Sequence, residues 1–358
     1  GGSDVTNLPG RQEDPVAITD GDGGAFIAWV DYRFDEEGDI FIQHVDNAGN
    51  RLMDNDGVAL ARIDGRHLSI NMCTDSLGGV YVAWQDKRNF LDDDIYGTHV
   101  SANHDIISPG TGIPIVVQGG NQNAKSIEYA GNNEAFIAWA DLRQGANADI
   151  YGQRLDVDME NSFEENGFQI AATDEQELKP RATYVTNETS FVAWKQGDEN
   201  SKVLYQFVDA SGLVFSDPKS ISDNTALQTA PRVKRSSIGE VFVNWKDLRD
   251  DPINGDQYFQ KIDVNGDRQW GDGIRVDPAE DVDFSARFSA GNTGDVNVVW
   301  ERGTFPEIDI MFQNINAEGN YSLEAPIAIS NVPGYQFAPI LSGNAEVGLY
   351  AVYGDQSS

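Results

Sequence analysis

A short apolar motif that ends in tryptophan recurs along the chain and constrains its fold more than any other feature. The motif first appears as Phe26-Ile27-Ala28-Trp29. Five further copies end at Trp84, Trp139, Trp194, Trp245 and Trp300, and a weaker seventh copy ends at Tyr353. Successive copies are 55, 55, 55, 51, 55 and 53 residues apart. Such near-equal spacing indicates an array of small structural units rather than one irregular domain.

Each repeat has the pattern of four short β-strands. In the fifth repeat these strands are expected at Pro231–Arg235, Glu240–Lys246, Gln257–Asp263 and Gly273–Val276. The segments are rich in β-branched and aromatic residues and are bounded by turn residues. No long segment with a helical period and helix caps occurs, so we expect very little helix. Four strands per repeat of this length predict an all-β fold, a β-propeller of four-stranded antiparallel blades.

The two ends of the chain indicate how the propeller closes. Asn7-Leu8-Pro9-Gly10 before Pro15 resembles Asn331-Val332-Pro333-Gly334 before Pro339. We therefore expect residues 3–7 to form a strand that closes the last blade of a seven-bladed ring, with a six-bladed ring as the alternative. A single propeller domain over residues 1–358 is predicted. Its repeats are 15–68, 69–123, 124–178, 179–229, 230–284, 285–337, and 338–358 together with 1–14.

The chain is strongly acidic. It holds 58 Asp and Glu against 25 Lys and Arg, a formal net charge of −33. This surface repels phosphate, which argues against nucleic acid and anionic membrane surfaces as partners. No apolar stretch is long enough for a membrane helix, so membrane insertion is not expected. The single cysteine, Cys73, allows no intrachain disulfide and is expected to be a buried small side chain.

Three charged residues follow the tryptophan at fixed spacing in four repeats. They are Asp31, Arg33 and Asp39 in the first repeat, Asp86, Arg88 and Asp94 in the second, Asp141, Arg143 and Asp149 in the third, and Asp247, Arg249 and Asp256 in the fifth. The fourth repeat lacks all three, which suggests that they interact. We expect each arginine to be held between two carboxylates as a structural ion pair of the loop between the second and third strands.

These motifs resemble a repeat found in secreted bacterial propeller proteins. The shared pattern is Trp-x-Asp-x-Arg, then Asp-Ile-Tyr-x-Gln and Asp-x-x-Gly, and it covers nearly the whole chain. The resemblance implies an exported, cell-surface protein, in some cases cargo of type IX secretion. It also implies a place in a larger chain or complex. It implies no particular activity, because one fold hosts many functions.

One position of the first strand differs between repeats. Thirteen residues before the tryptophan, three consecutive repeats carry Arg181, Arg232 and Arg287. In a propeller this position lies at the mouth of the central channel. Three neighbouring guanidinium groups would bind a carboxylate or sulfate, so these arginines are a candidate anion site. The competing interpretation is that each arginine pairs with a nearby loop carboxylate.

Turns dense in carboxylates are candidate calcium sites, because calcium prefers six to eight oxygen ligands. The candidate ligands are Asp20, Asp22, Asp54, Asp56, Asp92 and Asp93. None of these turns matches the twelve-residue EF-hand loop, and Asp is also an ordinary turn residue. No other cofactor is indicated.

No nucleophile elbow, phosphate loop or zinc motif occurs, so the sequence suggests no catalytic residue. The main hypothesis is therefore a non-enzymatic binding or scaffold module that contacts a glycan or protein at the cell surface. Its working surface would be the loops that join second to third and fourth to first strands. The alternative is a carbohydrate-active enzyme, a glycoside hydrolase or lyase, with a carboxylate pair at the channel mouth.

Overall fold

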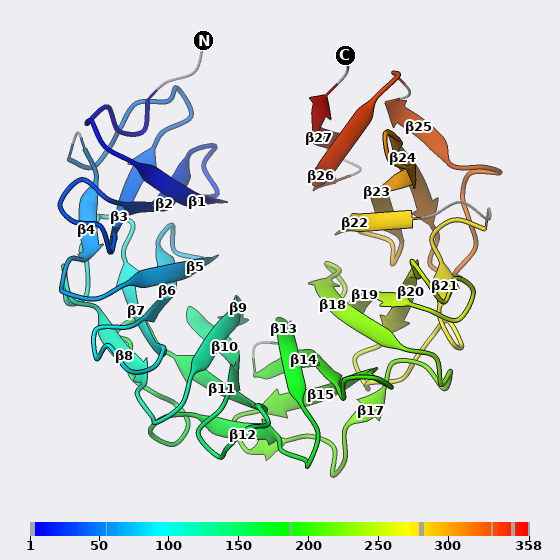
Figure 1. The fold of residues 1–358 in the computed structure, drawn as a ribbon, viewed down its shortest axis with the longest axis horizontal. Coiled ribbons are helices and arrows are strands. Elements are labelled where there is room, and N and C mark those ends of the chain that lie inside the picture. Colours follow the sequence, from blue (N-terminus) through cyan, green and yellow to red (C-terminus); the bar gives the residue numbers. More distant parts are fainter. Residues whose placement is uncertain are drawn as a thin grey trace. The chain divides into compact units, whose positions relative to one another are not determined.

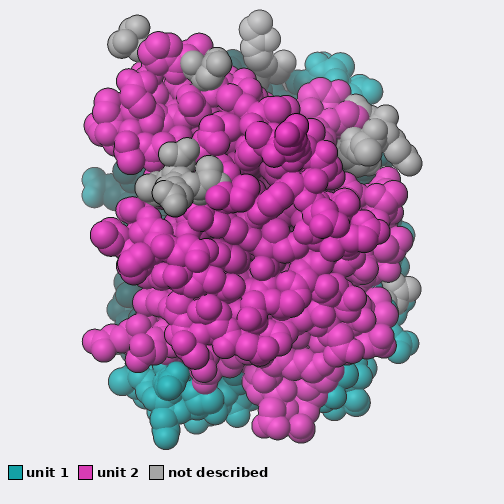
Figure 2. Space-filling model, turned by 90° about the vertical axis from the view of Figure 1, so that its right-hand side faces the viewer, with its two compact units in different colours: residues 1–192, 208–214 teal, residues 193–207, 215–358 magenta. Residues whose placement is uncertain are grey.

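The computed structural model describes residues 4–54, 56–186, 188–278, 283–330, 332–344 and 348–356. Its contacts divide the chain into two compact units, coloured separately in Figure 2. Unit 1 comprises residues 1–192 and 208–214, and unit 2 comprises residues 193–207 and 215–358. The division falls within the fourth repeat, and each unit is described by itself below.

Unit 1 contains three four-stranded antiparallel sheets, one for each of the first three repeats (Figure 1). The first sheet consists of β1 (Gln12–Thr19), β2 (Ala25–Asp31), β3 (Asp39–Val45) and β4 (Val58–Ala61). The second consists of β5 (His67–Thr74), β6 (Val80–Asp86), β7 (Asp94–Val100) and β8 (Ile113–Val116). The third consists of β9 (Gln122–Gly131), β10 (Glu134–Asp141), β11 (Asp149–Leu155) and β12 (Phe168–Ala171).

The later repeats form three more sheets. The fourth repeat contributes β13 (Glu177–Thr186), β14 (Thr189–Gln196), β15 (Lys202–Asp209), β16 (Gly212–Leu213) and β17 (Lys219–Ser220). The fifth contributes β18 (Gln228–Arg235), β19 (Val241–Asp247), β20 (Asp256–Ile262) and β21 (Ile274–Arg275). The sixth contributes β22 (Asp283–Ala290), β23 (Val296–Thr304), β24 (Glu307–Ile315) and β25 (Ile327–Ser330).

The seventh repeat is a hairpin of β26 (Tyr335–Asn344) and β27 (Gly348–Gln356). This hairpin joins the sixth sheet through one parallel pair, Ile308 with Tyr335. The described residues therefore contain six sheets. Four of these are four-stranded and antiparallel, which confirms the predicted all-β fold built from such sheets; the fourth sheet has five strands and the sixth has six. Residues 4–11 form no strand, which differs from the closing strand expected at residues 3–7; residue 3 lies outside the described residues. No helix of the described chain has the length and apolarity needed to cross a membrane.

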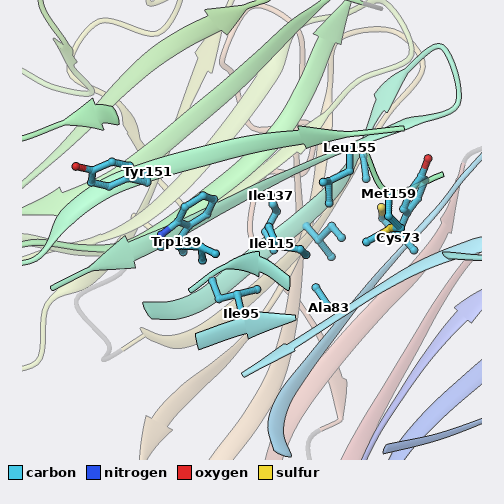
Figure 3. Packing of buried hydrophobic residues seen from close by; sticks show 13 residues of the cluster. Cys73, Ala83, Ile95, Ile115, Ile137, Trp139, Tyr151, Leu155 and Met159 are labelled. Carbon is cyan, nitrogen blue, oxygen red and sulfur yellow. The ribbon is translucent and has the colours of Figure 1, made fainter. Parts of the chain in front are cut away.

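Neighbouring sheets pack face to face through their apolar side chains. Between the second and third sheets, Ile95 and Ile115 meet Ile137 and Trp139 (Figure 3). Cys73 belongs to the same cluster, only 4% exposed, so its prediction as a buried small side chain is confirmed. The second strands of the first six repeats are largely buried, which explains why the Trp-ending motif is the most regular feature of the sequence.

A β-bulge interrupts the first strand of most repeats. In β1, Glu13 pairs with Val30 and Val16 pairs with Ala28, so two residues of β1 oppose one residue of β2. One bulge residue takes a positive φ in six repeats, at Asp14 (49°), Ser69 (52°), Lys179 (57°), Ala230 (54°), Ser285 (49°) and Ala338 (52°). Bulges re-aim the side chains that follow them and are common beside active sites.

A glycine just before the fourth strand packs under the tryptophan ring in four repeats. Gly167 has a φ of 93°, and a Cβ atom at this position would overlap the edge of the Trp139 ring. Gly57, Gly112 and Gly273 are placed in the same way. Gly167→Ala is therefore expected to destabilise the protein by about 2–4 kcal/mol, through backbone strain and overpacking. Denaturant unfolding measures the loss, and Gly119→Ala is the control, because Gly119 has open space around it.

Candidate functional site

The tryptophan, aspartate and arginine that recur in four repeats form one hydrogen-bonded unit. In the first repeat Trp29 Nε1 donates to Asp31 Oδ2 at 2.8 Å. Arg33 donates to the same oxygen at 2.5 Å and also to the backbone carbonyl of Asp56 at 3.0 Å. Asp31 is fully buried, and the arginine is nearly so. The arginine thus ties the loop after the second strand to the loop before the fourth.

The same contacts recur in the second, third and fifth repeats. The pairs Arg88–Asp86, Arg143–Asp141 and Arg249–Asp247 measure 2.5, 2.5 and 2.6 Å. The arginines donate to the carbonyls of Thr111, Asn166 and Asp272, which stand 27 residues after each tryptophan, as Asp56 does. Each guanidinium also lies within 4.4 Å of the centroid of an aromatic ring of the third strand, Phe41, Tyr96, Tyr151 or Tyr258. A contact set repeated so closely stabilises the fold.

The second aspartate of each predicted Asp-Arg-Asp set does not pair with the arginine as the first aspartate does. Asp39, Asp94, Asp149 and Asp256 are buried and face the first carboxylate across the strand pair. The guanidinium takes a backbone carbonyl as its second partner, and not this carboxylate, because the loop carbonyl lies within reach of the arginine's planar fork. Burial, together with neighbouring acids, raises the pKa of Asp39 and of Asp94 to about 6. The pKa of Asp149 and of Asp256 is raised as well, mainly by burial.

Arg88→Lys tests the clamp. A lysine keeps the charge but cannot contact Asp86, the carbonyl of Thr111 and the Tyr96 ring at once. We expect a loss of about 1–3 kcal/mol in the free energy of unfolding, measured by chemical denaturation. Lys87→Arg in the same loop serves as the control. An unchanged stability of Arg88→Lys would show that only the charge matters.

The sixth repeat reverses the arrangement. Arg302 stands where the first, second, third and fifth repeats carry the first aspartate, and the acid Asp283 lies opposite it on β22. Trp300 Nε1 donates to Asp283 Oδ1 at 2.8 Å, and Arg302 pairs with Asp277 at 3.2 Å. Asp283 is fully buried, and its second oxygen has no hydrogen-bond partner among the residues that the structure describes. Burial, reinforced by the charge of Asp277, raises the pKa of Asp283 to about 8.

The three arginines of the candidate anion site directly follow the strand bulges. Arg181 lies on β13 of unit 1, whereas Arg232 and Arg287 lie on β18 and β22 of unit 2. Burial lowers the pKa of Arg181 and of Arg287, while the charges of Glu128 and Glu301 oppose this effect. An anion site formed by all three arginines stays a prediction.

The candidate calcium ligands serve the turns in which they lie. Asp20 Oδ1 accepts hydrogen bonds from the amides of Asp22 and Gly24, and Asp20 Oδ2 contacts His44 at 3.0 Å. Asp54 and Asp56 offer backbone carbonyls to Gln43 and Arg33. Asp92 accepts from Asn89 and from the amide of Gly120, and the amide of Asp93 donates to Asn121. Within the described ranges, no three His, Cys, Asp or Glu side chains are grouped to hold a metal ion.

An open depression of 690 Å³ lies in unit 1, on the third repeat. The loop between β10 and β11 and the loop between β12 and β13 form it. Its lining residues are Gln144, Ala146, Asn147, Asp149, Ala172, Thr173 and Asp174. These are the same two kinds of loop that the sequence predicts as a working surface.

Two carboxyl groups in different environments line the depression. Asp149 is 5% exposed, and burial together with the charge of Asp141 raises its pKa. Asp174 is exposed to solvent. The hydroxyl of Tyr151, on the strand that Asp149 begins, accepts hydrogen bonds from Gln144 at 2.9 Å and from Gln169 at 3.1 Å. A pair of acids in contrasting environments is suited to general acid–base catalysis.

Sequence reasoning assigned only Asp149 of this lining, and assigned it as structural. Gln144, Asn147, Thr173 and Asp174 were missed because they belong to no motif. A comparison between repeats would have marked one of them: five residues after the tryptophan stand Phe34, Asn89, Gln144 and Asp250. A position that varies inside an otherwise regular repeat is a signal of a local function.

No protein-family model matches the chain, and no curated protein matches it. Solved structures do resemble it. An ulvan lyase, described as a new family of polysaccharide lyase, superposes with a TM-score of 0.57 at 10% identity, over 92% of this chain and 85% of that one. An ulvan lyase of the same new family bound to -[GlcA(1-4)Rha3S]- superposes with a TM-score of 0.53 at 9% identity, over 90% of this chain and 83% of that one. Another polysaccharide lyase superposes with a TM-score of 0.52 at 9% identity, over 85% of this chain and 77% of that one.

These likenesses support a propeller-like fold and correct the main functional expectation. The hypothesis of a non-enzymatic binding or scaffold module is contradicted, since the similar structures are polysaccharide-cleaving enzymes. The hypothesis rested on the lack of a catalytic motif. In a repeat fold, however, catalytic groups come from separate loops and leave no contiguous motif in the sequence.

Proposed function

We propose that this protein is a carbohydrate-active enzyme that cleaves a polysaccharide at the depression of the third repeat. The observation that carries the proposal is the pair of carboxyl groups there, Asp149 buried and Asp174 exposed, facing one open depression. In hydrolysis or elimination, one group must give a proton and another must take one. The propeller-like fold shared with polysaccharide lyases supports the same conclusion.

A depolymerisation screen tests this proposal. The purified chain is incubated with neutral and acidic polysaccharides, and two products are measured: new reducing ends, and unsaturated uronates detected by ultraviolet absorbance. A hydrolase yields only the first product, while a lyase yields both. Heat-denatured protein is the control. Absence of both products across the panel, with a folded protein, would refute the proposal.

The finer fold and the cellular setting belong to the same proposal. A seven-bladed ring is supported by the repeat count, since the seventh repeat supplies β26 and β27. Export to the bacterial surface is supported by the Trp-x-Asp-x-Arg repeat, which resembles secreted propeller proteins. A glycan is the partner that agrees with both the proposed activity and the proposed location at the cell surface.

A further inference from the structure

We infer that the depression of the third repeat takes an uncharged, hydroxyl-rich glycan and that the reaction is hydrolysis, not the elimination carried out on uronic acids. This inference rests on the proposed function and narrows it. It departs from the ulvan lyase whose solved complex contains glucuronate and a sulfated sugar. The argument comes from the hydrogen-bonding groups that line the depression.

The side-chain donors of the lining are already engaged inside the protein. Gln144 Nε2 donates to the Tyr151 hydroxyl at 2.9 Å, and Asn147 Nδ2 donates to the backbone carbonyl of Asp174 at 2.5 Å. The Thr173 hydroxyl donates to Glu177 at 2.5 Å, which uses the only hydrogen that it has. Each amide keeps one hydrogen for a ligand. The lining is therefore poor in donors.

The acceptors of the lining outnumber its donors. The lining includes the carboxyl groups of Asp149 and Asp174, and of their oxygens Asp149 Oδ2 also accepts a hydrogen bond from Gln169 Nε2 at 3.4 Å. Of the described residues that line the depression, none is Lys, Arg or His. The guanidinium of Arg143, which lies in the same loop as Gln144, is held by Asp141 at 2.5 Å and by the carbonyl of Asn166 at 2.8 Å. Nothing in the lining offsets the charge of an incoming anion.

These groups select against acidic sugars. A uronate or sulfate would lose its hydration beside two carboxyl groups without gaining a cationic partner, which is unfavourable. Sugar hydroxyls, by contrast, donate hydrogen bonds to carboxylate oxygens, and such charge-assisted bonds are strong. Elimination also requires a carboxyl group on the substrate to make the neighbouring C–H acidic, and a neutral sugar has none.

Hydrolysis fits the two carboxyl groups. The bond between the anomeric carbon and the glycosidic oxygen breaks, and the leaving oxygen takes the proton of Asp149. A solvent water forms the new bond to the anomeric carbon and gives its proton to Asp174. One water is consumed, and the proton on Asp174 returns to Asp149 through solvent. No oxidant, reductant or metal is required.

The test compares neutral and acidic polysaccharides under identical conditions. Arabinan, galactomannan and laminarin are the neutral probes, and alginate, polygalacturonate and ulvan are the acidic probes. Reducing ends and unsaturated products are both measured, at low and at high salt, with Asp149→Asn as the inactive reference. We expect at least about a 100-fold preference for a neutral probe, with no unsaturated product.

The possible outcomes separate the two proposals. Cleavage of a neutral probe that is lost in Asp149→Asn supports both. Cleavage confined to acidic probes, with unsaturated product and the same dependence on Asp149, overturns the inference and leaves the proposed function standing. Cleavage of no probe, by protein shown to be folded by circular dichroism, counts against the proposed function and removes the basis of this inference.

Discussion

Asp149→Asn is expected to lower the rate of glycan cleavage by about 100-fold or more, because it removes the group that protonates the leaving oxygen. The buried position of Asp149 and the charge of Asp141 keep its pKa raised, so that it holds a proton at higher pH than an ordinary aspartate. The asparagine has nearly the same shape but has no acidic proton. The measurement is the initial rate of reducing-end release on the best substrate of the screen.

The repeat supplies a matched control for this variant. Asp94 begins β7 of the second sheet as Asp149 begins β11 of the third, and both side chains are buried. Asp94→Asn therefore makes the same chemical change in the same structural setting, outside the depression. Its activity is expected to stay within about twofold of the activity of the unmodified protein, because Asp94 does not line the depression. Equal losses in the two variants would mean that Asp149 is structural only.

Asp283→Asn is expected to stabilise the protein as the pH rises from about 4 to 8. The pKa of Asp283 is raised from 3.8 to about 8 in the folded chain, mainly by burial. Over this window the folded state holds a proton that the unfolded state has released, so stability falls as the pH increases. A shift of this size is equivalent to on the order of 5 kcal/mol across the window.

Asparagine removes this titration without breaking the local structure. Its amide oxygen still accepts the hydrogen bond that Trp300 Nε1 gives to Asp283 Oδ1 at 2.8 Å. The facing charges of Asp256, Arg275, Asp277 and Arg302 are unchanged. Denaturation midpoints measured at half-unit pH steps should diverge from those of the unmodified chain as pH rises.

The control is Asp158→Asn, which makes the same substitution in an exposed turn and so reports the effect of altering one acid on a chain of large net charge. Its stability curve should run parallel to that of the unmodified protein. If the stability of Asp283→Asn also changed with pH in parallel with that of the unmodified protein, Asp283 would titrate like an ordinary aspartate in the folded chain.

Much of the fold followed from the sequence, as the fifth repeat shows. Its second and third strands were expected at 240–246 and 257–263 and are found at Val241–Asp247 and Asp256–Ile262. The first strand was expected from Pro231 but begins at Gln228, because pairing continues beyond the bulge at Ala230. A positive φ at an alanine leaves no mark in the sequence, so the bulges could not be predicted.

The candidate site was much less accessible to prediction. Asp149 was singled out only as one member of a repeated set, and its spacing is the same as that of Asp39 and Asp94. What distinguishes it is Asp174, which lies on a different loop 25 residues later. Whether side chains of two loops come together depends on the length and the turns of both loops. The spacing of residues along the chain therefore does not predict it.

The Trp-ending motif by itself determined the all-β repeat architecture, because a buried central strand needs the same apolar pattern in every copy. The charged residues after it were also marked by sequence, since they recur as a set. Only the tertiary structure decided how those charges are used: the arginine joins Asp31 to the carbonyl of Asp56, and Asp39 is left buried with a raised pKa. The reason is physical. Burial and through-space neighbours set the chemistry of a carboxyl group, and both arise only when distant loops fold together.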